Sequence, residues 1–156
     1  MKSCGECEAC CVLIGVRALA KPPGCECIHQ SGGKGCSIYA ERPDPCRTFN
    51  CVWVQGTKLF TGKDRPDKCG VMFVLMGADS AFVKATGLPV VSALEVYPGA
   101  FAQYHGERVL RKVSSKLLVM LVPYGGLAEG GGRELIGPAP MKQAAIAWLT
   151  SQRSPS

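Results

Sequence analysis

Cysteine is the residue type through which this chain could do chemistry, because its copies are many and closely spaced. Nine of the ten cysteines fall within residues 1–55. Thiols at such short spacing either pair as disulfides or bind metal ions as thiolates. The candidate metal ligands are the following eight: Cys4, Cys7, Cys10, Cys11, Cys27, Cys36, Cys46 and Cys51. Cys25 lies two residues before Cys27, and the choice between these two stays open.

The sequence favours metal binding over disulfides because it favours a reducing compartment. The cysteines begin at Cys4, where an apolar signal segment would have to lie, and no such segment is found. The longest apolar runs, residues 71–76 and 117–122, are too short to span a bilayer. We therefore expect a cytoplasmic protein with no membrane partner and with reduced thiols. Cys69, alone beside an apolar run, is expected to be an inert buried thiol.

A donor set made of thiolates selects soft metals, which are zinc, Cu(I) and iron–sulfur clusters. The spacing Cys4-x2-Cys7-x2-Cys10 is found both in zinc knuckles and around iron–sulfur clusters. The adjacent Cys10 and Cys11 project differently from the backbone, which suits two metal atoms better than one. Zinc or iron is the expected cofactor, the iron in some form such as a 4Fe–4S or 2Fe–2S cluster. His29 is interpreted as a solvated loop histidine rather than an accessory ligand.

Further short motifs follow the first cysteines in order. They are the segment 35–39 (Gly-Cys-Ser-Ile-Tyr), the pair Arg42-Pro43, and the block Cys46-Arg47-x-Phe49-x-Cys51. In this order they resemble the CxxCxxCC (YkgJ-type) family, whose members are described as zinc- or iron-chelating domain proteins and sometimes as Fe–S oxidoreductases. The resemblance covers residues 4–52 and implies the eight ligands named above. It supports metal chelation far better than catalysis, because the activity of the family is poorly defined.

Two arginines accompany this block, whose loop is stiffened by Pro43 and Pro45. Arg42 and Arg47 could offset clustered thiolate charge or donate hydrogen bonds near sulfur, which would tune a metal site. The alternative is that both are ordinary surface cations. The residues favour neither interpretation.

The formal net charge of +6 assumes neutral thiols. Eight thiolates would add eight negative charges and two divalent ions four positive ones, which leaves about +2. Four basic residues would share one helix face, which we interpret as solvated rather than as a nucleic-acid patch. These four are Arg108, Arg111, Lys112 and Lys116. Metal ions are therefore the expected partners, and nucleic acid is not.

Two regions of the chain differ in composition and in the pattern of apolar residues. Residues 1–55 are punctuated by Pro and Gly, so only a helix over 8–20 and a helical turn over 37–42 are expected. In residues 70–153 we predict strands at 71–76, 81–85, 89–97, 117–122 and 133–136, with helices at 100–115 and 140–152. In the last helix Met141, Ala145, Trp148 and Leu149 are expected to face inward.

The predicted fold class is α+β. An irregular cysteine-rich metal-binding segment (1–55) is attached to a small, mostly antiparallel sheet with two or three helices (70–153), packed as one globular unit. Bound metal would supply the folding energy that the first segment lacks.

The predicted function is a cytosolic metal-binding protein that chelates zinc or iron through eight thiolates. One alternative is an Fe–S oxidoreductase or electron-transfer protein, which the cysteine spacing fits equally well. The second alternative is a zinc-stapled module that binds nucleic acid or a protein partner. No catalytic residue is assigned, because histidine is scarce and no Ser/His/Asp or Cys/His set can be argued.

Overall fold

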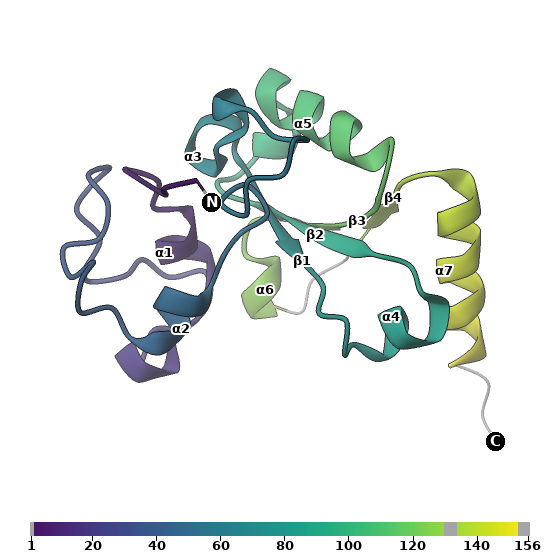
Figure 1. Cartoon of the computed structure of the whole chain (residues 1–156), viewed down its shortest axis with the longest axis horizontal. Helices are drawn as coiled ribbons and strands as arrows, with labels where there is room; N and C mark the ends of the chain where they lie inside the picture. Colours follow the sequence, from purple (N-terminus) through teal and green to yellow (C-terminus); the bar gives the residue numbers. More distant parts are fainter. Residues whose placement is uncertain (1, 130–133, 153–156) are drawn as a thin grey trace.

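The computed structural model describes residues 2–129 and 134–152 and has the predicted α+β fold (Figure 1). Its four-stranded sheet has the order β1-β2-β3-β4. The strands are Val71–Leu75 (β1), Val90–Glu95 (β2), Leu118–Val122 (β3) and Glu134–Ile136 (β4). The pairs β1–β2 and β3–β4 are antiparallel, whereas β2–β3 is parallel. The fold class is thus confirmed, in the form of a mixed sheet with mostly antiparallel pairing.

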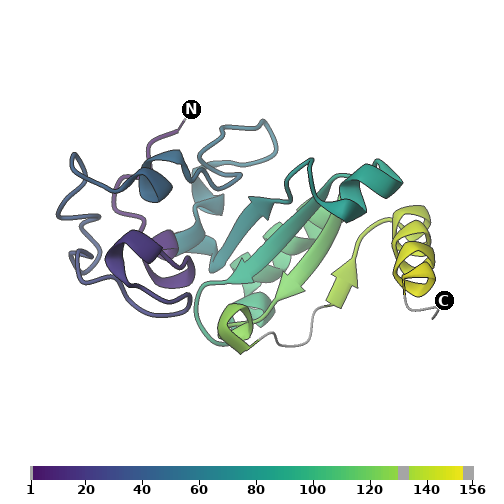
Figure 2. The ribbon, with the colours of Figure 1, turned by 90° about the horizontal axis from the view of Figure 1, so that it is seen from below.

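The parallel pair β2–β3 requires a crossover connection, which helix α5 (Tyr104–Ser114) provides. The apolar stripe of α5, Val109, Leu110 and Val113, is buried against the sheet. Gly106 lets the helix approach the 3-10 helix Ala100–Ala102, since a Cβ there would lie 2.0 Å from the carbonyl oxygen of Ala100. Figures 1 and 2 show α5 on one face of the sheet and the short helix α6 (Gly126–Glu129) on the other.

The predicted strand at 81–85 is wrong, because this segment forms helix α4 (Ala81–Thr86). The Ser80 hydroxyl caps the helix by accepting a hydrogen bond from the Val83 amide, and Gly87 ends it at a φ of +67°. Strand β1 pairs instead with β2, in the register Val71↔Glu95.

Helix α7 (Ala139–Ser151) lies with α4 at the end of the sheet away from the cysteines, as Figures 1 and 2 show. The two helices touch through an edge-on contact between Phe82 and Trp148, with ring centroids 5.2 Å apart. Ala145 is fully buried, as predicted, but Leu149 is 43% exposed and does not face inward.

The N-terminal region contains helix α1 (Ala9–Leu13), a 3-10 helix (Arg17–Leu19) and helix α2 (Asp44–Thr48). The predicted helix over 8–20 is too long, because Ile14 adopts an extended conformation directly after α1. Residues 37–42 form turns and no helix, contrary to the prediction. Helix α2 begins after Pro43 and has Pro45 in its first turn, where a missing N–H costs nothing.

One buried cluster joins the N-terminal region to the sheet. It includes Ala9 and Leu13 of α1, the segment 51–54, and residues of β1, β2, β3 and α5. Further contacts come from a backbone hydrogen bond of 2.8 Å, which the Val52 amide donates to the Phe73 carbonyl of β1. The metal-ligand candidates are therefore anchored on the main hydrophobic core. In the described part of the chain no helix is long and apolar enough to cross a bilayer.

A buried ion-pair cluster fastens the segment before the sheet to α5. Asp64 ends the 3-10 helix Gly62–Asp64, and its side chain is fully buried. Its carboxylate accepts hydrogen bonds from Arg108 and, at 2.9 Å, from Lys112. It also closes a capping box with Thr61, whose amide and hydroxyl donate to the same carboxylate oxygen. Two of the four basic residues of the predicted helix face are thus engaged in holding the fold.

Candidate metal centre

Seven of the eight predicted ligands line one cavity in the N-terminal region. The seven are Cys4, Cys7, Cys10, Cys11, Cys27, Cys36 and Cys46. The cavity has a volume of about 80 Å³, which is several times the space that one water molecule needs. The rest of its wall is largely apolar, with Ile14, Ile38 and Phe49 among the lining side chains. Residues up to 42 positions apart in sequence are thereby brought around one small space.

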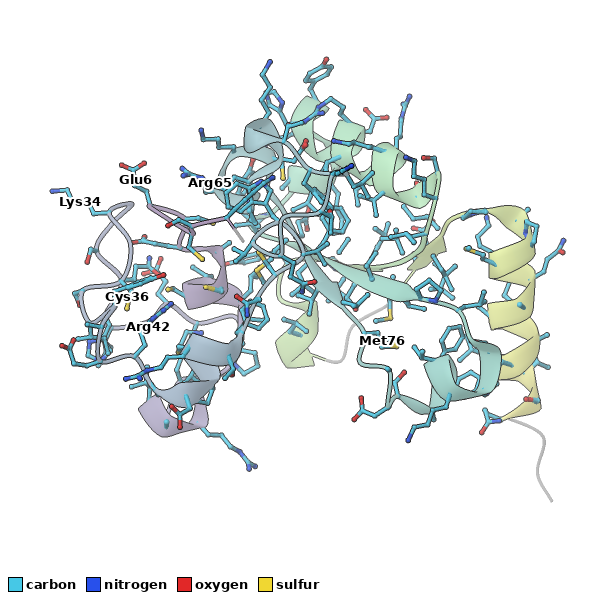
Figure 3. All side chains as sticks on the ribbon, viewed as in Figure 1. Glu6, Lys34, Cys36, Arg42, Arg65 and Met76 are labelled. Atoms are coloured by element: carbon cyan, nitrogen blue, oxygen red, sulfur yellow. The ribbon has the colours of Figure 1, made fainter. Side chains whose placement is uncertain are left out.

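Each part of the wall comes from a different local structure. Helix α1 carries Cys10 and Cys11, and the turn before it carries Cys4 and Cys7. Cys46 lies on α2. The long loop between the helices supplies Cys27 and Cys36. Figure 3 shows Cys36 and Arg42, which line the same cavity, in this region and far from Met76, which lies near α4.

The eighth predicted ligand, Cys51, lies in an adjoining cavity. This second cavity is also lined by Cys4, Cys7 and Cys10, which belong to both walls. Cys51 is buried at the start of the segment that joins the main core. The eight thiols thus surround two neighbouring cavities that share three of the cysteines. Such sharing suits the two-metal or polynuclear arrangement that the adjacent Cys10 and Cys11 indicated.

The thiols are grouped but do not form a closed coordination shell. Across residues 2–129 and 134–152, no group of three or more His, Cys, Asp or Glu side chains is arranged to hold a metal ion. The thiols share a common cavity wall, but they do not converge on one point. All ten cysteines are free thiols. The donor set fits a soft metal in its chemistry, and binding would require the thiols to move toward one another.

Burial makes several of these thiols harder to ionise. It raises the pKa of Cys4, Cys46 and Cys51, and that of Cys7 to about 11. For Cys4 and Cys46, neighbouring cysteines add to the effect, because a second thiolate would repel the first. A metal ion binds the thiolate and not the thiol, so binding would release protons and weaken as the pH falls.

The adjacent pair Cys10 and Cys11 behaves differently. A hydrogen bond from the Cys10 thiol favours the Cys11 thiolate, which lowers the pKa of Cys11 to about 7 and raises that of Cys10 above its usual range. Lys21 and Arg42 act in the same direction on Cys11. Cys11 is therefore the more readily ionised thiol of the pair, in the wall of the cavity.

Two cations line the cavity, and spacing had pointed to only one of them. Arg42 stacks on the Tyr39 ring at 3.6 Å from its centroid, with Nε donating to the Tyr39 carbonyl. Arg47 is exposed and donates instead to the carbonyls of Arg42 and Ala40, which braces the loop. Of the two arginines, only Arg42 belongs to the cavity wall.

Lys21 is the cation that sequence reasoning missed. Only 8% of the surface of this residue is exposed to solvent. Its Nζ donates to the carbonyls of Val12 and Ile14, at 3.1 and 2.6 Å, which satisfies the C-terminal end of α1. Burial lowers the pKa of Lys21, while Cys27 and Cys11 oppose this effect. A buried positive charge at this place favours thiolates in the cavity.

The structure separates the remaining cysteine and histidine candidates. Cys27 lines the cavity, whereas Cys25 is exposed and lies outside its wall. His29 is half-buried and also lines the cavity. Cys69 is 1% exposed, as predicted, and burial raises its pKa to about 11.

Comparisons with known proteins add no relative to this description. No protein-family model, no curated protein and no solved structure gives a significant match to the chain. The resemblance to the CxxCxxCC family therefore rests on the motifs of residues 4–52 alone.

Proposed function

We propose that this protein binds zinc or iron through thiolates of its N-terminal region. The observation that carries the proposal is that seven of the eight cysteines selected by spacing line one cavity, and that the eighth adjoins it. These cysteines come from four separate stretches of chain, so their meeting is not a consequence of sequence proximity. The all-sulfur donor set, with one imidazole at its side, has the chemistry of a zinc or iron–sulfur site.

The electrostatics of the region support the same proposal. Lys21 and Arg42 bring positive charge to a wall that would become strongly negative when its thiols ionise. Charged groups beside metal ligands can tune such a site. Because thiolate ligation needs reduced cysteines, we assign the protein to a reducing compartment such as the cytoplasm. Family membership in the CxxCxxCC group is part of this proposal.

A redox role is the alternative that the ligand spacing keeps open. The run Cys4-x2-Cys7-x2-Cys10 is a spacing of iron–sulfur proteins, and all three residues line both cavities. A bound cluster would supply electron transfer, and the protein would supply the apolar wall that controls its exposure to solvent. A nucleic-acid role has weaker support, because Arg108 and Lys112 pair with Asp64, and Arg111 pairs with Glu107.

The neighbouring cysteines 25 and 27 provide a matched test of the ligand set. We expect Cys27→Ser to lower the bound metal per chain by a third or more and Cys25→Ser to leave it unchanged, because only Cys27 lies in the cavity wall. Metal content is measured by mass spectrometry after anaerobic purification of each variant. Equal metal content in Cys27→Ser and wild type would contradict the assignment of Cys27. A loss in Cys25→Ser alone would transfer that role to Cys25.

A further inference from the structure

Glu8 is a charged residue within the cysteine motif, and its position in the sequence does not indicate which residues it contacts. It stands between Cys7 and the first residue of α1, and its carboxylate reaches a loop more than 20 residues away. Oε1 accepts hydrogen bonds from the amides of Ser31 and Gly35, at 2.9 and 3.0 Å, and Oε2 accepts one of 2.8 Å from Gly33. Three amides of one short loop thus converge on a single side chain.

The loop is built to present these amides. Gly32, Gly33 and Gly35 have φ angles of +61°, +87° and +95°, which side-chain-bearing residues rarely adopt. Successive amides in such conformations form a concave site for an anion, and here the anion is the Glu8 carboxylate. The Ser31 amide donates to the Gly35 carbonyl at 2.9 Å, which closes the loop on itself. Figure 3 shows Lys34 projecting outward from this loop, away from the cavity.

The loop also rests on the segment between the first two cysteines. A Cβ on Gly35 would lie 3.0 Å from the carbonyl oxygen of Gly5, so only glycine allows this approach without displacement. The next residue is Cys36, which is held by a bridge to Gln30 and lines the cavity. The loop is therefore fixed at Gly5 and Glu8, immediately before it delivers Cys36.

We propose that Glu8 is a positioning residue that holds Cys36 against the cysteines of α1. At one end of the contact, Gly35 directly precedes Cys36. At the other end, Glu8 lies two residues before Cys10. The Glu8 carboxylate thereby sets the separation of two ligand candidates that are 26 positions apart in sequence. This role in a metal site rests on the function proposed above. The hydrogen bonds from the loop amides to the Glu8 carboxylate, which we call the clamp, exist without metal.

The clamp is tested first in the metal-free protein. We expect Glu8→Ala to increase the exchange rate of the Gly33 and Gly35 amides at least tenfold in hydrogen-exchange NMR, because their acceptor is removed. Glu26→Gln, at an exposed glutamate of the same region, serves as the control and should leave both rates unchanged. Unchanged amide exchange in Glu8→Ala would overturn the clamp, whatever the protein binds.

The positioning role is tested by zinc affinity in competition with a chelator. Glu8→Ala is expected to weaken zinc binding roughly 10- to 100-fold, the range for residues that orient metal ligands. In a Cys36→Ser background the same substitution should have little further effect, whereas in a Cys27→Ser background it should keep most of it. Equal effects in the two backgrounds would overturn the link to Cys36. If wild-type protein binds no metal, the proposed function fails, and the amide exchange still decides whether the clamp exists.

Discussion

Substitution of Cys10 by serine is expected to remove more metal than substitution at any position that lines only one cavity. Cys10 belongs to both cavity walls, and it lowers the pKa of the adjacent Cys11, which eases ionisation of that thiol. We expect Cys10→Ser to reduce the metal per chain by roughly half or more, because a structural site rarely survives the loss of a shared ligand. Elemental analysis of anaerobically purified protein measures the effect.

Cys46→Ser is the matched control, since Cys46 lines the first cavity only. It should lower the metal content less than Cys10→Ser does. The Cys10 variant should also destabilise residues 1–55 more than the sheet, which hydrogen exchange can resolve by region. The assignment of shared ligands would be wrong if the metal content of both variants equalled that of the wild type.

Substitution of Asp64 by alanine is expected to lower the free energy of unfolding by about 3 kcal/mol, near the lower end for breaking a buried ion pair. The reason is that the fully buried Asp64 carboxylate holds Arg108, Lys112 and Thr61 together. The value is kept low because both cations are about one-third exposed and can recover water contacts. Urea unfolding measures the difference. An alanine at the exposed Asp79 should change stability by less than about 0.5 kcal/mol.

The stabilisation by Asp64 should depend on pH. Burial alone would raise the pKa of Asp64, but hydrogen bonds from Thr61, Lys112 and Arg108 outweigh it and hold the pKa well below its usual range. A carboxyl group with a lower pKa in the folded chain stabilises the fold above its unfolded pKa of about 3.9. This contribution is lost as the pH falls through the folded-state value. The stability difference between wild type and Asp64→Ala should therefore shrink below about pH 4, and a constant difference would contradict this account.

Seven of the eight cysteines proposed from the sequence line one cavity, although the sequence left the choice between Cys25 and Cys27 open. The parts that hold the thiols in place were not predictable in the same way. Lys21 and Glu8 bind backbone carbonyls and amides. Because almost every residue has these groups, the sequence does not show which residues will be the partners. The glycines at 32, 33 and 35 indicated a turn but not the carboxylate that it would bind.

The errors in the predicted elements have related causes. The alternation of apolar and polar residues in 81–85 is too short to distinguish a strand from a helix. The N-terminal cap at Ser80 stabilises the helix. The helical turn predicted over 37–42 lies just before Pro43, whereas proline is favoured at the start of a helix, and α2 follows Pro43. Strands β1, β2 and β3 were predicted well, because short apolar runs of this length are typical of buried strands.

The central claim is that the N-terminal thiols hold metal, and the most direct test is metal and acid-labile sulfide analysis of anaerobically purified wild-type protein, with a visible absorption spectrum. We predict stoichiometric zinc or iron. A colourless protein with about two zinc ions per chain would indicate a structural or chelating role. A brown protein with iron and sulfide would indicate a cluster and make redox function the lead. A protein that carries neither metal and takes up neither on reconstitution would contradict the account.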